Sequence, residues 1–328
     1  MVEIMDLVQR PRRNRQSKEI RALVRETELT PSDLIWPLFV VEGKNIEQPI
    51  ASMPGVYRRS IDKLIEAAKA AHGRGIPAVA LFPALDDALK TPTGKESLNA
   101  EGLLPRCVHA LKSAIPSLLV ITDVALDPYS SDGHDGIVKD GKILNDESVS
   151  VLVKMAEVQC AAGADLVAPS DMMDGRIGAI REALDNNGYS DRGILAYTAK
   201  YASAFYGPFR DALESAPKFG DKKTYQMDPA NTREALRELE LDLDEGADIV
   251  MVKPALPYLD IIQEFSHHSA VPVAAYQVSG EYSMICAAAQ NGWLDRKAAA
   301  LEALMAIRRA GANMILTYFA DEASEWLS

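Results

Sequence analysis

The stretch EGADIVMVKP, residues 245–254, joins a glycine to a short apolar run that ends in a lysine and a proline. Related stretches occur as AAGADLV from residue 161 and as AGANMI from residue 310. In each of them the glycine suits the left-handed conformation that ends a helix, and the apolar run is typical of a strand buried on both faces. These stretches therefore predict helices that lead into parallel strands.

Eight apolar runs of strand length alternate along the chain with segments of helical periodicity. The predicted strands are residues 36–40, 78–82, 118–123, 165–171, 193–199, 248–253, 271–279 and 313–319. Strands that alternate with helices indicate an α/β chain with a parallel sheet. Eight such units favour a (β/α)8 TIM barrel, and the chain has no GxGxxG sequence to support an open doubly wound sheet.

Two of the predicted helices carry start signals. Ser60 can cap a helix that has an apolar face at 61, 64, 65, 68 and 71. Asn231 and Glu234 have the spacing of a capping box, which predicts a helix from there to Gly246.

The composition limits the classes of partner and the compartment. The 328 residues are 48% hydrophobic, and 47 acidic residues against 35 Lys and Arg give a net charge of −12, which disfavours nucleic acid as a partner. Cys107, Cys160 and Cys286 form no CxxC pair, so a reducing compartment is expected. The N-terminal residues lack the apolar core of a signal peptide, and no apolar run has the length of a membrane span. We therefore expect a cytoplasmic protein without a membrane partner.

The first 30 residues form a basic segment ahead of the first strand. We interpret residues 1–30 as an N-terminal arm and residues 31–328 as the catalytic barrel domain. Such an arm can be a solvated extension or can wrap an acidic neighbouring subunit, and the acidic body favours the second interpretation. The basic residues of the arm are Arg10, Arg12, Arg13, Arg15, Lys18, Arg21 and Arg25.

Two lysines stand at the ends of consecutive predicted strands. A barrel carries its active site at the C-terminal ends of its strands, so Lys200 and Lys253 should meet there. Burial and a second ammonium both lower the pKa of a lysine, and a neutral amine attacks a ketone or aldehyde to form a Schiff base. The alternative is that each lysine only reaches solvent from the rim. Nearby aromatic residues favour the first interpretation, and they are Tyr197, Tyr201, Phe205 and Tyr258.

Long motifs around these lysines resemble one known family. They are GADIVMVKPALPYLDI (246–261), AKYASAFYGPFRDA (199–212), DVALDPYSSDGHDG (123–136), APSDMMDGRIGAIREAL (168–184), SAPKFGDKKTYQ (215–226) and YQVSGEYSM (276–284). Over essentially the whole chain the sequence is similar to the porphobilinogen synthases, also called 5-aminolevulinate dehydratases. The resemblance implies a lyase that condenses two 5-aminolevulinate molecules to porphobilinogen with loss of two waters, in haem or chlorophyll biosynthesis. It also implies a homo-octamer assembled through the arm.

The resemblance assigns roles to particular residues. Lys253 would form the Schiff base with the substrate that becomes the propionate side, and Lys200 the imine with the acetate-side substrate. Asp123 is a candidate for proton transfer, although a carboxylate at a strand end can also be purely structural. The expected substrate-carboxylate ligands are Ser279 and Tyr318 for the first molecule and Arg210, Lys222 and Gln226 for the second. The last three come from the segment 206–226, whose composition is that of a mobile lid.

The sequence departs from the zinc-dependent members of the family. Their three zinc-binding cysteines correspond to Ala125, Asp127 and Asp135 here. Carboxylates suit Mg²⁺ or leave no tight site, so no catalytic Zn²⁺ is expected and an active-site cation on the two aspartates stays open. His134 keeps a weak transition-metal interpretation open.

A second metal site follows from the magnesium-responsive members of the family. Their allosteric Mg²⁺ site corresponds to Glu238 and Asp171, with Arg12 of a neighbouring arm as a possible further contact. The resemblance implies that Mg²⁺ stabilises the octamer there. By spacing alone Glu238 is an ordinary solvated helix charge.

Two other functions fit parts of the pattern. Another class I Schiff-base aldolase or lyase on a TIM barrel needs one reactive lysine and usually a phosphate or hydroxyl site, whereas this chain has paired lysines and no Gly-rich phosphate loop. A non-catalytic barrel that serves as an assembly module would tolerate substitution of either lysine.

Overall fold

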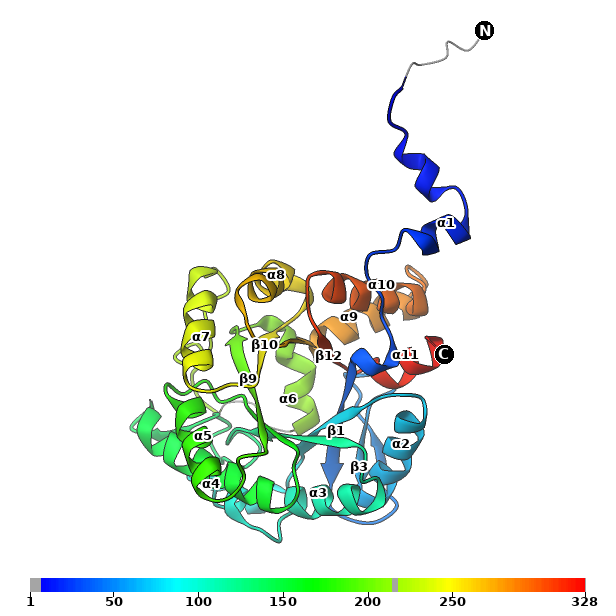
Figure 1. Ribbon diagram of the computed structural model, residues 1–328. Coiled ribbons are helices and arrows are strands. Elements are labelled where there is room, and N and C mark those ends of the chain that lie inside the picture. Colours follow the sequence, from blue (N-terminus) through cyan, green and yellow to red (C-terminus); the bar gives the residue numbers. More distant parts are fainter. Residues whose placement is uncertain (1–6, 214–217, 328) are drawn as a thin grey trace.

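The computed structural model describes residues 7–213 and 218–327. Within these residues, eight parallel strands form a barrel that closes because β12 pairs with β1, with Leu34 opposite Ile315 (Figure 1). All eight predicted strands are confirmed. Around the barrel they are β1 (Leu34–Val41), β4 (Ala78–Pro83), β5 (Leu119–Val124), β8 (Leu166–Pro169), β9 (Gly193–Lys200), β10 (Ile249–Lys253), β11 (Val273–Gln277) and β12 (Met314–Thr317).

Helices surround the barrel and cover the outer faces of its strands (Figure 1). The longer ones are α2 (Ile61–Gly73), α3 (Leu103–Ala114), α4 (Asn145–Ala161), α5 (Arg176–Asn186), α7 (Arg233–Asp244), α8 (Leu259–His268), α9 (Ser279–Gln290) and α10 (Arg296–Arg309). Shorter elements are α1 (Lys18–Leu23), α6 (Gly207–Leu213), α11 (Ala320–Trp326), β2 (Glu47–Pro49), β3 (Tyr57–Ser60), β6 (Ile137–Lys139) and β7 (Lys142–Leu144). The (β/α)8 barrel predicted from the sequence is therefore correct.

The glycines of the three repeated stretches lie where the chain turns from helix to strand. Gly163, Gly246 and Gly311 have φ angles of +106°, +95° and +117°. L-residues with a side chain rarely adopt this region, so the glycines allow the short turn that the repeats predicted.

The predicted helix starts are only partly right. Thr232, not Asn231, is the N-cap of α7, and no side chain caps the helix there. The Asn231 amide instead donates to Glu234 Oε2 at 2.7 Å. Ser60 is the N-cap of α2, but its hydroxyl donates to Asp62 Oδ1 and accepts from the backbone of Ile46, so it does not cap the helix N–H groups.

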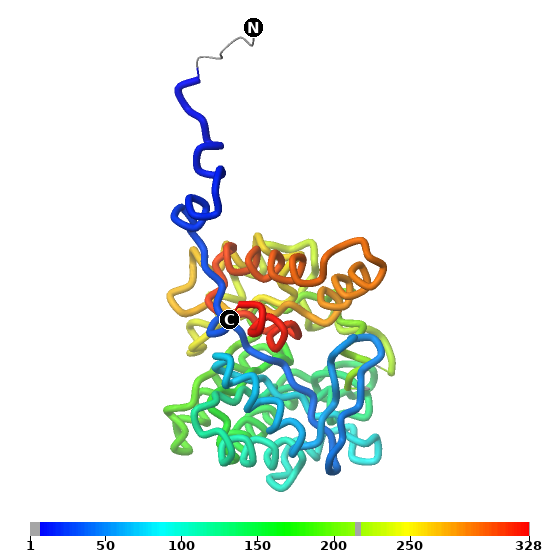
Figure 2. The backbone as a smooth tube through the Cα atoms, turned by 90° about the vertical axis from the view of Figure 1, so that its right-hand side faces the viewer, coloured from blue at the N-terminus to red at the C-terminus, as the bar shows by residue number. Residues whose placement is uncertain are grey.

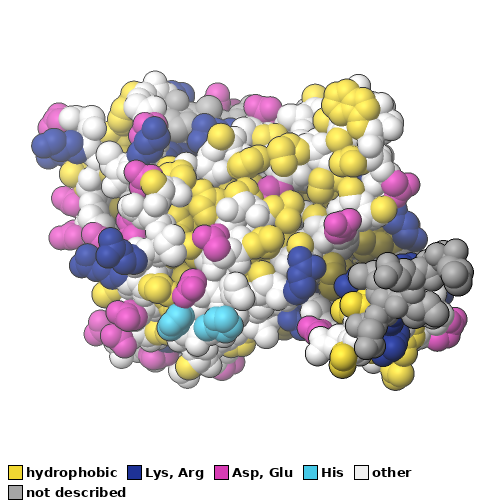
Figure 3. Space-filling model, turned by 90° about the horizontal axis from the view of Figure 1, so that it is seen from above, with side chains coloured by type: hydrophobic (Ala, Val, Ile, Leu, Met, Phe, Trp, Pro, Cys, Tyr) yellow, Lys and Arg dark blue, Asp and Glu magenta, His cyan; other side chains and the backbone are white. Residues whose placement is uncertain are grey.

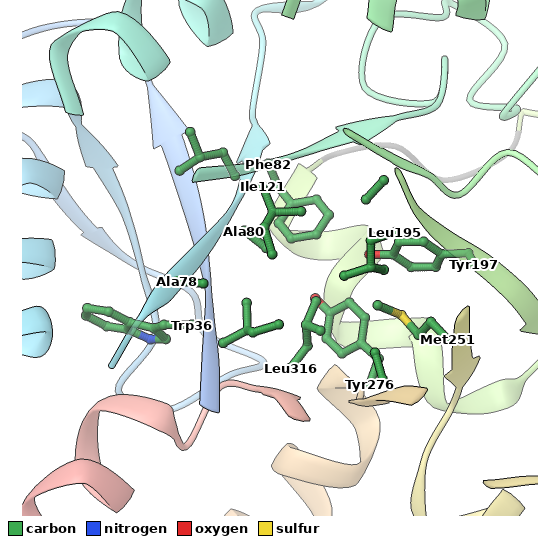
Figure 4. Close-up of a cluster of buried hydrophobic side chains, with 14 of the residues drawn as sticks. Trp36, Ala78, Ala80, Phe82, Ile121, Leu195, Tyr197, Met251, Tyr276 and Leu316 are labelled. Atoms are coloured by element: carbon green, nitrogen blue, oxygen red, sulfur yellow. The ribbon is translucent and has the colours of Figure 1, made fainter. Parts of the chain in front are cut away.

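Aromatic side chains fill one layer of the barrel interior (Figure 4). Phe82 and Tyr197 each lie within 6.5 Å of Tyr276, measured between ring centroids. Phe39 stacks on Tyr318 with 5.9 Å between the rings. The interior at this level is a packed aromatic layer, and it carries the polar site described below.

The N-terminal arm leads away from the barrel (Figures 1 and 2). It contains a 3-10 helix, Pro11–Arg15, and α1, and no residue of either is buried. Leu23 is 81% exposed. Basic and apolar side chains of the arm are visible from above in Figure 3. The role of residues 1–30 in subunit contacts stays a prediction. Among the described residues, no helix has both the length and the apolar character needed to cross a membrane.

The turn at Gly246 generates a stability prediction. The substitution Gly246→Ala places a Cβ in a left-handed backbone conformation and 3.2 Å from Arg181 Cγ, so it should lower the free energy of unfolding by about 1–2 kcal/mol. Gly73→Ala, in a helix with open space around the new Cβ, is the matched control and should be neutral or stabilising by up to about 1 kcal/mol. Urea unfolding of both variants measures the difference, and equal midpoints would contradict the role of the turn.

Candidate active site

Lys200 and Lys253 lie opposite each other at the C-terminal ends of β9 and β10. They are register partners in the parallel ladder. Both are nearly excluded from solvent, with 5% and 6% of their surface exposed. The expectation that the two side chains meet at the barrel mouth is confirmed, and neither lysine simply reaches bulk water from the rim.

Aromatic rings surround the amine of Lys253. Its Nζ lies 4.7–5.3 Å from the ring centroids of Tyr197, Tyr206, Phe209 and Tyr276. Burial, followed by the charge of Lys200, lowers the pKa of Lys253 to about 7. An amine with this pKa is neutral in a large fraction of molecules at neutral pH and can act as a nucleophile.

Lys200 has more polar surroundings. Its Nζ donates to the carbonyl oxygen of Ser170 and lies 3.6 Å from Asp135 Oδ2. Asp123 also lines the space between the two lysines. Burial, and secondly the charge of Asp127, raises the pKa of Asp123 to about 7, so this carboxyl group can both accept and donate a proton near neutral pH.

Lys222 reaches Asp127 and Asp135, the two aspartates that the family resemblance matches to zinc-binding cysteines. Its Nζ lies 3.1 Å from Asp135 Oδ1 and 3.5 Å from Asp127 Oδ2. Although burial opposes ionisation, Lys200 and Lys222 lower the pKa of Asp135. At Asp127 burial is the larger effect and raises the pKa. A metal ion on these carboxylates would therefore have to displace Lys222.

The predicted carboxylate ligands divide into two groups. Arg210, Lys222 and Gln226 line the same cavity as the two lysines. Ser279 is buried, and its hydroxyl accepts from the backbone N–H of Phe209 at 3.0 Å. The hydroxyl of Tyr318 is hydrogen-bonded to that of Tyr276 at 2.8 Å. Ser279 and Tyr318 thus contact residues whose rings surround Lys253, but they do not line this cavity themselves.

The cavity between these groups is small. Its free volume is about 30 Å³, enough for one or two water molecules but too small for two organic acids. Phe209 and Arg210 of α6, with Lys222 and Gln226 further along, form part of its lining. Residues 214–217 of the predicted lid segment, which include the first three residues of the SAPKFGDKKTYQ motif, lie outside the described residues.

A family model described as delta-aminolevulinic acid dehydratase matches residues 8–326. The chain belongs to this family. A chloroplastic delta-aminolevulinic acid dehydratase of Physcomitrium patens is 60% identical over 97% of the chain and 74% of that protein. The enzyme of Bradyrhizobium diazoefficiens is 56% identical over 98% of the chain and 92% of its own length. The chain is therefore an enzyme of the lyase class.

A solved structure agrees over the same length. The delta-aminolevulinic acid dehydratase of Toxoplasma gondii, in complex with the reaction product porphobilinogen, superposes with a TM-score of 0.97. It is 53% identical and covers 98% of this chain and 92% of its own. The similarity includes the whole barrel, so the family assignment rests on the fold as well as on the motifs.

The sequence places Tyr197, Tyr201 and Phe205 beside Lys200 and Tyr258 beside Lys253, and it misses most of the rings that surround the Lys253 amine. Tyr201 and Tyr258 stack on each other, 4.1 Å apart, and do not supply the rings around the amine. Of the four aromatics named from the sequence, only Tyr197 is among the rings around Lys253. The other rings belong to Tyr206, Phe209 and Tyr276, and the signal that could have found them is their place in the family motifs AFYGPF and YQVSG.

Glu238 lies away from the lysines, in a wide surface cavity of about 780 Å³ that Asp174 and Glu234 also line. Burial, partly offset by Arg176, raises its pKa, and neighbouring carboxylates add to the effect. Asp171 is buried, accepts from the N–H of Met173 and lies 3.8 Å from the guanidinium of Arg176. Arg176 also contacts Asp242 at 3.5 Å, so one buried cation joins both sides of this acidic region.

The pKa of Lys253 predicts a pH dependence for Schiff-base formation. Its folded-state pKa is lowered from 10.5 to about 7, so the neutral amine predominates above pH 7 and declines about tenfold per pH unit below it. We expect reductive trapping of 5-aminolevulinate on Lys253 with cyanoborohydride to rise with pH to about 7 and then level off. Asp123→Asn removes a negative charge that raises this pKa, so it should shift the midpoint to lower pH. A midpoint near 10 would contradict the assignment.

Proposed function

We propose that Lys253 and Lys200 each form a Schiff base with one 5-aminolevulinate molecule and that the chain joins the two molecules into porphobilinogen in tetrapyrrole biosynthesis. The observation that carries this proposal is the placement of two buried lysines as register partners at the barrel mouth. A single-lysine aldolase would not need the second amine. The membership of the dehydratase family supports the same reaction and makes the aldolase and assembly-module interpretations weaker.

The two lysines differ in a way that suits two substrates. The amine of Lys253 lies among aromatic rings and has a lowered pKa, so it adds readily to a ketone carbon; loss of the ketone oxygen as water then gives the imine. Lys200 lies beside Asp135, which can stabilise a protonated imine. Asp123 can take up and return the protons of these steps. Each imine formation releases one water, and both lysine amines leave again when one C–C and one C–N bond join the substrates, so two waters balance the overall reaction.

Carboxylate recognition requires the cavity to open. The carboxylate of one substrate would be held by Arg210, Lys222 and Gln226. Lys222 would then leave Asp127 and Asp135 and bind the substrate carboxylate instead. Ser279 and Tyr318 would hold the other carboxylate once Phe209 moves away from the Ser279 hydroxyl. A lid formed by the segment 206–226 would then close again and exclude water, which favours imine formation.

Mass spectrometry after borohydride reduction tests the proposed chemistry. Incubation with 5-aminolevulinate should give adducts on Lys253 and Lys200, whereas Lys112, which is paired with Asp165, serves as an internal control and should stay unmodified. Lys253→Met should keep the fold and lose activity to below about one-thousandth, because the covalent intermediate is lost. Protein that stays unlabelled and makes no pyrrole would refute the proposal.

The acidic region at Glu238 supports a second proposal, an allosteric Mg²⁺ site. Magnesium prefers carboxylate oxygen and water ligands. Asp174, Glu234 and Asp242 surround Glu238 with negative charge that a divalent ion would relieve. Asp171 would contact the ion through water, and Arg12 of a neighbouring arm would complete the site. Arg12 can reach this site only if the exposed basic arm binds a second copy of the chain. We therefore propose that Mg²⁺ binding stabilises the homo-octamer.

Sedimentation with and without Mg²⁺ tests this second proposal. Mg²⁺ should increase the octamer fraction and the activity of the unmodified chain, and Glu238→Gln should remove both responses. Glu240→Gln, an exposed residue on the same helix, is the matched control and should respond like the unmodified chain. The proposal fails if Mg²⁺ changes neither property and Glu238→Gln sediments normally.

Several expectations stay predictions. The absence of a catalytic Zn²⁺ is supported by the chemistry of Ala125, Asp127 and Asp135, which offer no thiolate. The cytoplasmic location and the absence of a nucleic-acid partner rest on the sequence composition.

A further inference from the structure

Glu281 is a fully buried carboxylate just behind the end of β10. Its side chain has no surface exposure. Oε1 accepts a hydrogen bond from the N–H of Leu256 at 2.6 Å, and Oε2 accepts from Val278 at 2.7 Å and Ala255 at 3.3 Å. Three backbone donors therefore converge on one side chain.

These donors belong to the chain segments that leave two neighbouring strands. Ala255 and Leu256 follow Lys253, the last residue of β10, by two and three positions. Val278 directly follows β11. Because β10 and β11 are adjacent in the barrel, the carboxylate joins their exits immediately beyond the amine-bearing residue.

The backbone of Lys253 is also held from the other side. Its carbonyl oxygen accepts from the N–H of Tyr201 at 3.0 Å and from the hydroxyl of Tyr206 at 3.3 Å. Tyr201 and Tyr206 thus hold the carbonyl of Lys253, and Glu281 holds the backbone N–H groups that follow it.

The start of α9 cannot shift easily to compensate for a changed side chain. A Cβ at Gly280 would lie 2.5 Å from the carbonyl oxygen of Phe205, so the helix and this segment are in close backbone contact. The backbone of residue 281 is therefore held in place. Its carboxylate accepts hydrogen bonds from Ala255 and Leu256 and so fixes the backbone of these two residues.

We propose that Glu281 is a positioning residue that holds the backbone after Lys253 so that the amine faces the substrate ketone. This inference rests on the proposed Schiff-base function. A carboxylate is required because three donors meet two acceptor oxygens. A glutamine offers one acceptor oxygen and an NH₂ group, so at least one backbone N–H would face another donor.

Lysine-specific trapping rates test the proposal. Glu281→Gln and Glu281→Asp are compared with the unmodified chain in adduct formation with 5-aminolevulinate and borohydride, quantified separately at Lys253 and Lys200. A small displacement of a reacting group can cost about a hundredfold in rate. We expect the Lys253 adduct to form about tenfold to a hundredfold more slowly and the Lys200 adduct to change by less than about twofold.

A matched control separates positioning from general destabilisation. Glu322→Gln removes an ion pair with Arg296; neither residue lines the cavity of the two lysines, so the ratio of the two adducts should stay unchanged. Circular dichroism and thermal unfolding identify the folded variants.

Three outcomes would overturn the inference. The first is a Lys253 adduct that forms at the unmodified rate in a folded Glu281→Gln variant. The second is an equal fall in the rate of adduct formation at Lys253 and at Lys200. The third is that neither Glu281→Gln nor Glu281→Asp folds. The second and the third outcome would each show that Glu281 supports the whole barrel. If the unmodified chain forms no adduct, the Schiff-base function itself is wrong.

Discussion

The buried pair of amines at the barrel mouth is the constraint on which the rest of the site depends. Two ammonium groups at neighbouring strand ends repel each other, and burial raises the free energy of both charges. The two lysines have different surroundings that reduce this cost. Lys253 lies among aromatic rings with a lowered pKa, and Lys200 lies against Asp135. The repulsion is therefore relieved by a lowered pKa at Lys253 and by a carboxylate partner at Lys200.

Carboxylates keep the remaining charge of the site in balance. Asp123, Asp127 and Asp135 lie with Lys200, Lys222 and Lys253 around one small cavity. Removing one member would leave another buried charge without its partner, which costs more than the pair contributes. Lys222 takes part in this balance through its contacts with both Asp127 and Asp135.

The barrel supplies the precision that this chemistry needs. Register pairing places Lys200 beside Lys253, and hydrogen bonds with Tyr201, Tyr206 and the Glu281 carboxylate surround the strand end. Part of the cavity lining is built differently, from a short helix and a loop. Lysines held on strands next to a short helix and a loop suit the proposed lid, which would admit two substrates and then exclude water.

Local patterns in the sequence were sufficient for the fold and for the choice of the two candidate lysines. Glycine turns followed by apolar runs specify helices and strands through neighbouring residues alone, and the two lysines stand out because they end such runs. The family motifs then indicated the reaction. These features depend on residues close together in the chain, so no knowledge of the folded contacts was needed.

The surroundings of the amines depended on contacts between distant segments. Phe209 and Tyr276 reach Lys253 from a short helix and from another strand, and Lys222 meets Asp135 across 87 positions (222 − 135). The role proposed for Glu281 also arises only where the exits of two strands come together. Periodicity reports which face of an element is buried, but the partner across the interface is set by how the barrel closes.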